Sequence, residues 1–439
     1  MIADFKPYAE YKDSGVHWLG EVPRHWTVLP AFGAFKPNKA RNIGMKEKTV
    51  LSLSYGRIVI KPAEKLHGLV PESFETYQIV NPGDIVLRTT DLQNDHTSLR
   101  VGMVRDRGII TSAYLALRAI SGVSPDYGFQ FLNVWDSSKA IYGYGSGLRQ
   151  SLEFSHFKRM PIAIPPPTEQ AAIVRFLDWA NGRLERAIRA KRKQLVLMGE
   201  RVLAETEQAL RSDDIVTHRL STIAQVMSRP IDRRGDQMYT RIGLYNRGRG
   251  IFVKPTAPGT DLGDSDFFTV LSGDFVISGQ FAWEGAVALV RAKESGCIAS
   301  HRYPILRGSD GMVSSAYLYA FFRSSYGAML LDHHSRGAAG RNRPLNAQRL
   351  MKEKIPVPSS HAQERIEFLL EQEYAIKQSV ERLVRSINEY RTRLVADVVT
   401  GKLDVREAAT RLPDEELLPD LAAADDEPDD LPIEEEDDG

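Results

Sequence analysis

The chain repeats its own order of short motifs, and this repeat constrains the fold more than any other feature. LSLS at 51–54 with KP at 61–62 returns as IGLY at 242–245 with KP at 254–255, and VNPGDIV at 80–86 returns as VLSGDFV at 270–276. AIP at 163–165 with QAAI at 170–173 returns as PVP at 356–358 with QERI at 363–366. All offsets fall between 190 and 193 residues. The pattern predicts two copies of one unit, each a globular part followed by a helix.

The globular parts span 1–165 and 212–358. Short β-rich runs, such as 84–87 and 275–277, lie among Gly, Pro, Asn and Asp residues that favour turns. Apolar stretches at 129–135 and 316–322 are typical of helices. A Gly-Asp pair before each β-rich run suits a tight turn, because Gly tolerates positive φ and Asp bonds its own backbone. We expect two compact α+β modules.

Two long helices are predicted at 166–211 and 359–402, with Thr168 as the N-cap of the first and Gly401 as the C-cap of the second. Apolar residues alternate steps of three and four, which is a coiled-coil seam. The first helix carries Ile173, Leu177, Ala180, Leu184, Ala187, Leu195, Met198 and Val202 in this seam, which Lys191 interrupts. The second carries Ile366, Leu369, Ile376, Val380, Leu383, Ile387, Tyr390 and Leu394, with only Glu373 polar. The helices either pair with each other, antiparallel, as a spacer, or pack into an ordinary globular core.

The formal net charge of zero hides an uneven distribution. After Arg411 the chain has no basic residue and fourteen acidic ones. Without these fourteen, 43 acidic residues face 57 basic residues in 1–411, a net charge of +14. The composition predicts that 403–439 is a disordered acidic tail, which is either a solubilising appendage or a tail that mimics DNA or binds a partner. The basic body predicts a polyanionic partner.

Patterns of active sites are missing from the sequence. It has no GxxxxGK[ST] nucleotide loop, no HExxH pair, no Asn/Asp-Pro-Pro-aromatic tetrapeptide and no glycine motif for a methyl-donor cofactor. The single cysteine, Cys297, excludes internal disulfides and a cysteine-rich zinc site. No apolar run is long enough for a membrane span, and the first residues lack a signal core, so we expect a cytoplasmic protein. We therefore expect no catalytic residues, no cofactor and no metal.

Signals of nucleic-acid binding are stronger. The two modules carry net charges of +5 and +6, and basic and amide residues cluster in their glycine-rich segments. Arg, Asn and Gln can read base edges with two hydrogen bonds, and glycine lets backbone amides approach phosphates. The DNA-binding candidates are Arg57, Lys61, Arg88, Tyr144, Arg149, Gln150, Arg233, Arg234, Asn246, Arg247, Arg249, Lys254, Arg336, Arg341, Asn342 and Arg343. The competing interpretation is a solvated surface with ordinary salt bridges.

Two segments resemble one known family. YKDSGVHWLGEVPRHW at 11–26 resembles the start of specificity (S) subunits of type I restriction–modification systems, and IAIPPPTEQ at 162–170 with Ile173 resembles the start of their first spacer helix. In the second copy IPVP at 355–358 is followed by Gln363 and Ile366, but Ala362 stands where the first copy has Glu169. The resemblance covers about 8–402 and leaves out the acidic tail.

The resemblance implies a non-catalytic reader of double-stranded DNA. Two target-recognition domains would each read one half of a bipartite, asymmetric site, and two antiparallel helices would bind two adenine methyltransferase (M) subunits, which restriction/translocase (R) subunits can join. The expected fold class is α+β, with the two domains separated by two long antiparallel coiled-coil helices in a pseudo-twofold arrangement. Two alternatives stay open: a stand-alone DNA-modifying enzyme, and a coiled-coil scaffold without DNA specificity.

Overall fold

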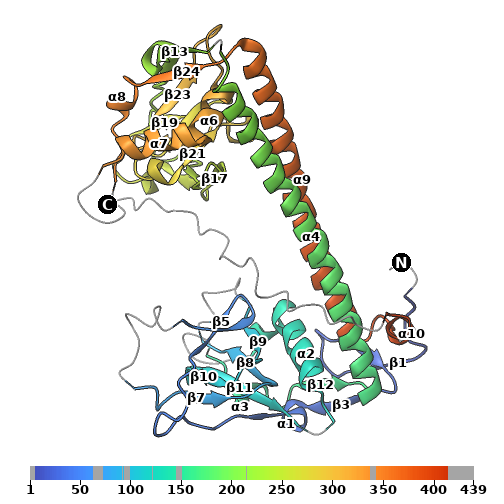
Figure 1. Cartoon of the computed structure of the whole chain (residues 1–439). Coiled ribbons are helices and arrows are strands. Elements are labelled where there is room, and N and C mark those ends of the chain that lie inside the picture. Colours follow the sequence, from blue (N-terminus) through green and yellow to red (C-terminus); the bar gives the residue numbers. More distant parts are fainter. Residues whose placement is uncertain are drawn as a thin grey trace. The chain divides into compact units, whose positions relative to one another are not determined.

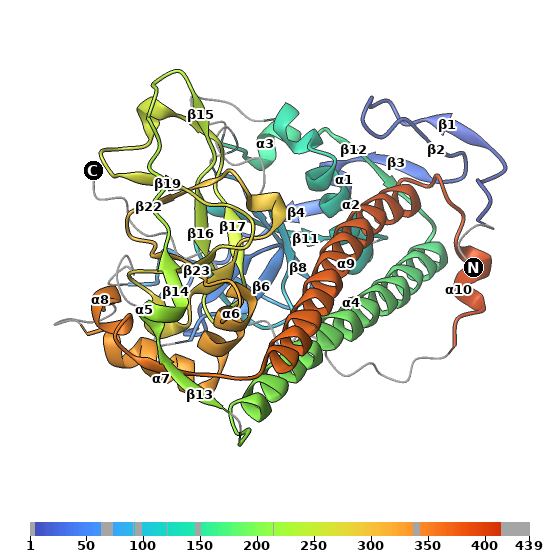
Figure 2. The same cartoon turned by 90° about the horizontal axis from the view of Figure 1, so that it is seen from above.

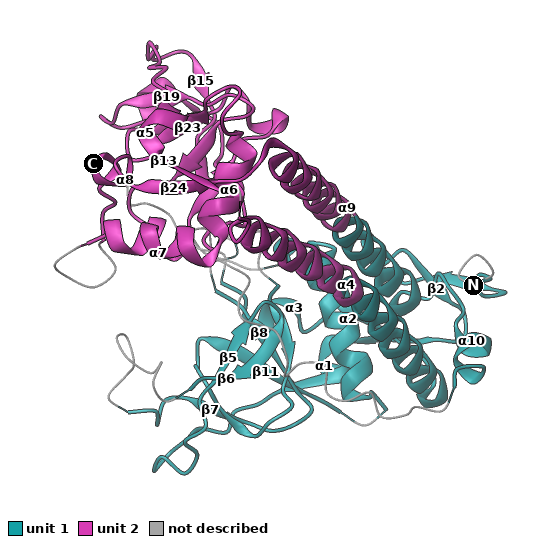
Figure 3. Cartoon of the chain, turned by 45° about the horizontal axis from the view of Figure 1, so that its top comes forward, with its two compact units in different colours: residues 1–188, 383–416 teal, residues 189–382, 417–439 magenta. Residues whose placement is uncertain are grey.

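A computed structural model describes residues 5–62, 73–90, 92, 99–120, 122–144, 151–213, 215–336 and 343–413. The chain divides into two compact units, coloured separately in Figure 3: Met1–Ile188 with Leu383–Glu416, and Arg189–Arg382 with Leu417–Gly439. Each unit contains one α+β module and parts of two long helices. The expected fold class, α+β modules with two long antiparallel helices, is confirmed. Most of the predicted acidic tail, from residue 414, lies outside the described residues. Its predicted start at 403 is wrong, because Val405 and Ala409 are buried in the core of the first unit.

The first module alternates short strands with short helices. Its elements are β1 Tyr11–Asp13, β2 Glu21–Pro23, β3 Thr27–Pro30, α1 Ala31–Ala34, β4 Phe35–Pro37, β5 Leu51–Ser54, β6 Arg57–Ile60, β7 Gln78–Val80, β8 Asp84–Arg88, β9 Val101–Met103, β10 Gly108–Ile110, β11 Tyr114–Ala119, α2 Pro125–Ser137, η2 Ala140–Gly143, α3 Phe154–Phe157 and β12 Pro161–Ile164. The long helix α4, Pro167–Ala209, follows and continues into the second unit.

The second module has the same order of main elements. It contains β13 Val216–Arg219, α5 Leu220–Ile223, β14 Ala224–Val226, β15 Met238–Tyr239, β16 Ile242–Leu244, β17 Ile251–Val253, β18 Ala257–Pro258, η3 Gly259–Asp261, β19 Phe267–Thr269, β20 Phe275–Ile277, η4 Ala282–Glu284, β21 Val287–Leu289, η5 Ala292–Glu294, β22 Ile298–Ser300, β23 Ile305–Gly308, α6 Ser315–Arg323, α7 Ser325–His334, α8 Ala347–Leu350 and β24 Lys354–Val357. The long helix α9, Ser360–Val399, and the short α10, Arg406–Thr410, end the described chain.

The sheets of the two modules have the same topology. In the first, four antiparallel strands run in the order β4-β11-β8-β9, and in the second the order is β14-β23-β20-β21. Each module also has a strand pair that closes it next to its long helix, β3 with β12 and β13 with β24. A helix of matching position, α2 or α6, buries aromatic residues against this sheet, among them Phe131 in the first and Phe322 in the second. The repeat of the sequence is therefore a repeat of the fold.

The Gly-Asp pairs lie in equivalent turns, as the sequence predicts. Gly83 and Gly273 have φ of +89° and +87°. Asp84 and Asp274 are both buried, and each accepts the backbone N–H three residues before it, at 2.9 and 2.8 Å. Arginine guanidinium groups neutralise both carboxylates: Arg118 pairs with Asp84, and Arg229 and Arg307 pair with Asp274. A buried carboxylate with charged and backbone partners fixes the start of the central strand in each module.

The long helices pack antiparallel. In the first unit Arg391 Nη2 of α9 lies 2.6 Å from Glu185 Oε1 of α4, and in the second unit Arg365 Nε of α9 lies 2.8 Å from Glu205 Oε1. Higher residue numbers on α4 therefore meet lower numbers on α9. In both Figure 1 and Figure 2 the two ribbons lie side by side. Gly401, with φ of +76°, follows the end of α9 as the expected C-cap residue.

Burial follows the predicted seam of the two helices. Its buried members are Ile173, Leu177, Val202, Ile366, Leu369, Val380, Ile387 and Leu394, and the partly buried ones are Leu184, Leu195, Met198, Ile376, Leu383 and Tyr390. Two details of the prediction are wrong. Ala187 is exposed and Ile188 is buried, because a step of four from Leu184 keeps the seam on one face at 3.6 residues per turn. Helix α4 begins at Pro167, so Thr168 lies inside its first turn and is not the N-cap.

The residue that differs between the two helix starts has a structural explanation. Glu169 is 4% exposed and accepts hydrogen bonds from Tyr8 Oη at 2.5 Å and Trp26 Nε1 at 2.9 Å, with His25 Nε2 2.8 Å away. These three partners belong to the segment that precedes β3. In the second copy the chain that precedes β13 is α4 itself. The second module therefore has no corresponding N-terminal segment that a side chain at position 362 could bind.

Candidate nucleic-acid interface

The candidates on the first module lie on two strands and in one loop. Arg57, on β6, and Lys61, just after it, are exposed, whereas Arg88 at the end of β8 is half-buried. Tyr144 is half-buried with its ring 5.6 Å from that of Trp135, and burial raises the pKa of its hydroxyl. Arg57 and Lys61 thus lie at the start of β6 and just after its end. Arg149 and Gln150 lie outside the described residues.

Arg88 pairs with a second arginine that sequence reasoning missed. Arg100 is fully buried, and its backbone N–H donates to Asp136 Oδ2 at 2.7 Å. Its guanidinium donates to the carbonyl oxygens of Thr90 at 2.8 Å and Arg88 at 3.3 Å. A cation held by backbone oxygens inside the module fixes the end of β8. No local pattern marks Arg100 as buried, because its partners come from three separate segments.

On the second module the Asn246–Arg249 cluster forms the tip of the β16–β17 hairpin. Asn246 donates to Glu284 Oε2, and Arg249 Nε donates to the Asn246 carbonyl oxygen at 3.0 Å with its guanidinium 5.3 Å from the Tyr245 ring. Arg247 is exposed. Lys254, after β17, is half-buried. Two of the predicted base-reading residues, Asn246 and Arg249, therefore already interact with other residues of the protein.

Two buried side chains hold the backbone of this tip. Tyr319 Oη of α6 donates to the Gly248 carbonyl oxygen at 2.6 Å, and Lys377 Nζ of α9 donates to the Arg249 carbonyl oxygen at 2.5 Å. Burial raises the pKa of Tyr319 and lowers the pKa of Lys377. The loop is thus attached to the long helix of its own unit. Sequence reasoning missed both residues, since neither lies near the loop in the chain.

An ion pair reinforces the same attachment. Arg323 of α6 and Glu373 of α9 form two hydrogen bonds of 2.7 Å, with side chains 11% and 17% exposed. Burial by itself would lower the pKa of Arg323, but Tyr319 and Glu373 outweigh burial and raise it. Glu373, the only polar residue of the predicted seam, therefore serves the contact between helix and module.

Arg343 packs against η4, the element that also contacts the hairpin tip. Arg343 is partly buried, donates to Asp332 Oδ1 at 2.6 Å and lies 4.7 Å from the centre of the Trp283 ring. Glu284, the next residue of η4, accepts from Asn246, and its carbonyl oxygen accepts the Arg247 N–H at 2.9 Å. Arg336 is exposed. Arg341 and Asn342 lie outside the described residues.

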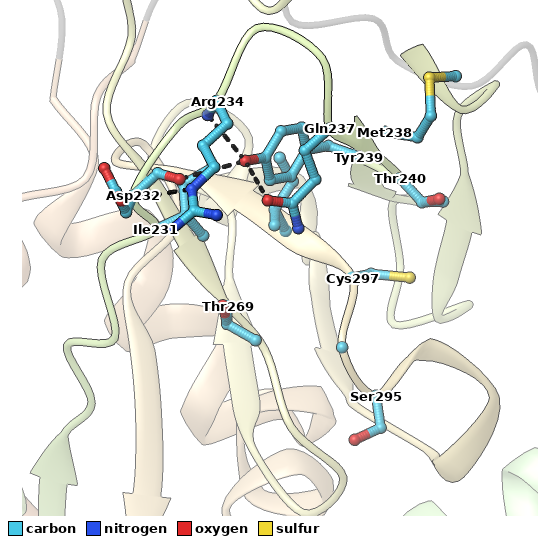
Figure 4. Close-up of a pocket in the computed structure, with 12 residues that line it drawn as sticks. Ile231, Asp232, Arg234, Gln237, Met238, Tyr239, Thr240, Thr269, Ser295 and Cys297 are labelled. Carbon is cyan, nitrogen blue, oxygen red and sulfur yellow. Dashed lines mark hydrogen bonds and ion pairs between the residues drawn. The ribbon is translucent and has the colours of Figure 1, made fainter. Parts of the chain in front are cut away.

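Arg233 and Arg234 lie in an exposed loop before β15, beside a pocket of about 680 Å³ (Figure 4). The Tyr239 hydroxyl accepts the Arg234 backbone N–H at 3.1 Å and lies 3.1 Å from Gln237 Oε1. The Arg234 guanidinium lies 3.7 Å from Asp232, and Arg233 donates to the Gly263 carbonyl oxygen. Arg233 and Arg234 therefore belong to a different loop of the second module from the hairpin tip.

The described residues contain no group of three or more His, Cys, Asp and Glu side chains placed to hold a metal ion. Within the same residues no helix combines the length and the apolar composition needed to cross a bilayer. What the surface offers is exposed cationic and aromatic side chains on hairpins and loops whose backbones are fixed.

Comparison with known proteins gives matches among solved structures alone. No protein-family model matches the chain, and no curated protein matches it. One match is a chain of a solved structure described as the structural basis underlying complex assembly and conformational transition of the type I R-M system. That chain is 16% identical, with a TM-score of 0.48, and the match covers 87% of this chain and 98% of that one.

Two further solved structures match over similar lengths. The HsdS subunit from Thermoanaerobacter tengcongensis is 15% identical, with a TM-score of 0.41, and the match covers 88% of this chain and 98% of that one. The type I restriction-modification system S subunit from M. genitalium is 13% identical, with a TM-score of 0.40 and coverage of 89% and 97%. Over most of its length the chain is similar to solved S subunits of type I restriction–modification systems, the family that its sequence resembles.

Proposed function

We propose that the chain is a non-catalytic subunit that recognises DNA sequence within a multisubunit methyltransferase and endonuclease. Each α+β module contacts one half of a bipartite, asymmetric site in double-stranded DNA. The two long helices bind two adenine methyltransferase subunits, and restriction/translocase subunits join that complex.

One observation carries the proposal: a basic module occurs twice with the same internal construction, and each copy is continuous with a long helix. Equivalent sheets, equivalent buried aspartates and equivalent closing strand pairs occur in both copies. A duplicated reader on a stiff connection suits a target with two separate parts. The two helices are similar in length, 43 and 40 residues, and in each copy a glutamine near the helix start, Gln170 or Gln363, bonds the preceding proline carbonyl oxygen.

The positive charge of each module supplies affinity that does not depend on sequence. The net charges of +5 and +6 favour phosphate contacts, and the release of counterions makes such binding weaken with added salt. Arg57 and Lys61 on the first module and Arg233 and Arg336 on the second are exposed and suited to phosphates. Discrimination between bases then requires a few side chains that reach base edges.

The helices offer a surface for protein partners. On α4, Val196 and Leu197 are neighbours that are 59% and 54% exposed, and on α9 Phe368 is 62% exposed. Apolar side chains on otherwise charged helices fit contact with another protein better than contact with DNA. We assign this contact to the methyltransferase subunits, which would supply the methyl-donor chemistry that the chain lacks.

The decisive experiment is methylome sequencing of a host that carries the chain with its methyltransferase subunits. We expect one methylated motif made of two specified parts separated by a gap of unspecified bases. Removal of this chain should abolish the motif, while the methyltransferase subunits remain intact.

Two outcomes would favour the alternatives. Methyl transfer to DNA by the purified chain alone would establish an enzyme. A reconstituted complex that binds a duplex with the motif and a random duplex equally, at the same salt concentration, would establish a scaffold without DNA specificity.

A further inference from the structure

The same hairpin projects from each module. β5 pairs with β6 in the first module and β16 with β17 in the second. Both hairpins are anchored alike: Val50 bridges Ile109, and Arg241 bridges Ile298. The N–H groups that follow the second strands also match, from Lys61 to the Val50 carbonyl oxygen and from Lys254 to that of Arg241, each at 2.8 Å. The two hairpins are therefore equivalent in their anchoring, although two residues separate the last paired residues in the first (Ser54 and Arg57) and six separate them in the second (Leu244 and Ile251).

Each tip holds a large side chain on left-handed backbone. Tyr55 has φ of +47° and is 79% exposed, and Arg247 has φ of +56° and is exposed. Each is followed by a glycine with positive φ, Gly56 at +77° and Gly248 at +64°. Left-handed backbone is unfavourable for a residue with a Cβ and favours Gly or Asn. A long side chain at this position therefore carries a conformational free-energy cost in both copies.

The backbone of the second tip is fixed while its side chain is left in solvent. The N–H groups of Arg247 and Gly248 donate to the carbonyl oxygens of Glu284 at 2.9 Å and Gly285 at 2.7 Å, and Tyr319 holds the Gly248 carbonyl oxygen. By contrast, no hydrogen bond or ion pair with another described residue engages the Arg247 guanidinium. An unoccupied guanidinium on a fixed backbone is available to a ligand, and binding has to order only its side chain.

The first tip is fixed by packing. A Cβ at Gly56 would lie 3.1 Å from Leu99 Cβ, and at Gly102 of β9 a Cβ would collide with Leu53 and Ile58 of the hairpin. The hairpin thus lies tightly on β9. The Tyr55 ring makes no ring contact with other described residues, and exposed Arg57 and Lys61 follow it on the same hairpin. Positive charge next to an exposed aromatic ring is typical of a nucleic-acid contact.

We propose that Tyr55 and Arg247 are equivalent base-contacting residues, one for each half of the recognised site. Arg247 donates two hydrogen bonds to O6 and N7 of a guanine in the major groove, the contact for which a guanidinium is suited. Tyr55 packs its ring against a base of the other half-site. Neighbouring cations contact phosphates. This inference rests on the proposed DNA-reading function.

The test measures binding of the complete complex with its methyltransferase subunits to the methylated motif, to variants of each specified base pair and to random duplex. For Arg247→Ala we expect the affinity for the motif to fall about 5- to 150-fold, with discrimination lost at one G·C pair of one half-site. For Tyr55→Ala we expect discrimination lost in the other half-site, and for Tyr55→Phe we expect it retained. Affinity for random duplex should fall less than about threefold in all three.

Two further variants separate base reading from folding and charge. Arg247→Gly relieves the left-handed backbone, so we expect a melting temperature equal to or above that of the parent, together with the same loss of discrimination. Arg219, on β13, is also exposed, and Arg219→Ala removes an equal charge from the same module. We expect Arg219→Ala to leave discrimination unchanged.

The results decide the inference in either direction. Equal loss on the motif and on random duplex would make Arg247 a phosphate contact and overturn the inference, as would retained discrimination in Arg247→Gly or effects of both tips on one half-site. A parent complex without any sequence preference would instead refute the proposed function, so the two failures are distinguishable.

Discussion

Gln170 and Gln363 make the same three hydrogen bonds in the two modules. Gln170 Oε1 accepts the Ser124 N–H at 2.7 Å, and its Nε2 donates to the Gly122 and Pro165 carbonyl oxygens at 2.8 Å. Gln363 Oε1 accepts the Ser314 N–H at 3.0 Å, and its Nε2 donates to the carbonyl oxygens of Met312 at 3.0 Å and Pro358 at 3.1 Å. Each glutamine therefore joins the start of a long helix to the turn before the main helix of its module.

We expect Gln170→Ala and Gln363→Ala each to lower the free energy of unfolding by about 1–3 kcal/mol, because each change removes a buried amide and leaves one buried carbonyl oxygen, of Pro165 or Pro358, without its partner. Denaturant unfolding of the purified chain measures this loss. Gln194→Ala is the matched control, since Gln194 is exposed on α4 and its loss should cost little. Equal stability of all three variants would mean that water replaces the glutamine amides at both sites.

The repeat in the sequence predicted this equivalence because both glutamines follow a Pro-containing strand end by the same five residues. The same reasoning identified the Gly83 and Gly273 turns and the two helix seams. The spacing of residues along the chain determines which face of a helix or strand each one occupies, and in both copies the apolar face is the buried one.

Side-chain partners from distant segments could not be predicted in this way. Asn246 and Arg343 belong to the residue types that read bases, yet Glu284 and Asp332 occupy them. Lys377 lies 128 residues from the loop that it holds. Composition identifies candidate residue types, but only the fold decides which of them remain available to a ligand.

The Tyr55-Gly56 tip could have been found from the sequence. A two-residue turn ending in Gly between LSLS and RIVI is a strong hairpin signal. What the sequence could not supply was the exposure of the ring.

Breaking the ion pair between Arg323 and Glu373 should be costly. Glu373→Leu alone leaves a mostly buried guanidinium without its carboxylate, and we expect a loss of about 3–5 kcal/mol in the free energy of unfolding. The double variant Arg323→Leu, Glu373→Leu removes both charges and should be more stable than Glu373→Leu alone. Additive losses in this double-mutant cycle would show that the two side chains do not depend on each other.

Acid should weaken the contact between α4 and α7 through Glu207. Glu207 Oε1 accepts the N–H of Ser325, the first residue of α7, at 2.9 Å, and this bond lowers the pKa of the carboxyl below its ordinary value of 4.5. Because the folded pKa is the lower one, the stabilisation is complete above about pH 4.5 and is lost as the pH falls through the folded value.

We expect Glu207→Gln to reduce stability at pH 7 by about 0.3–1 kcal/mol, and we expect this difference to shrink as the pH falls through the lowered pKa of the folded carboxyl. Unfolding free energies at pH 7, 5 and 3 test this. Glu200→Gln, a change of an exposed carboxylate on the same helix, is the control. A Glu207→Gln penalty that persists unchanged at pH 3 would contradict an electrostatic origin.

The gap in the recognised motif should follow the length of the helix pair. Because Glu185 meets Arg391 and Glu205 meets Arg365, four residues must be added to both helices, after Ile188 of α4 and after Arg382 of α9, to keep these pairs opposed. Four residues add about 6 Å, close to two base-pair steps. Methylome sequencing should therefore find unchanged half-sites and a gap about two base pairs longer. Insertion in α9 alone breaks the matched seams and should lower stability; an unchanged gap after the paired insertion would refute a spacer role.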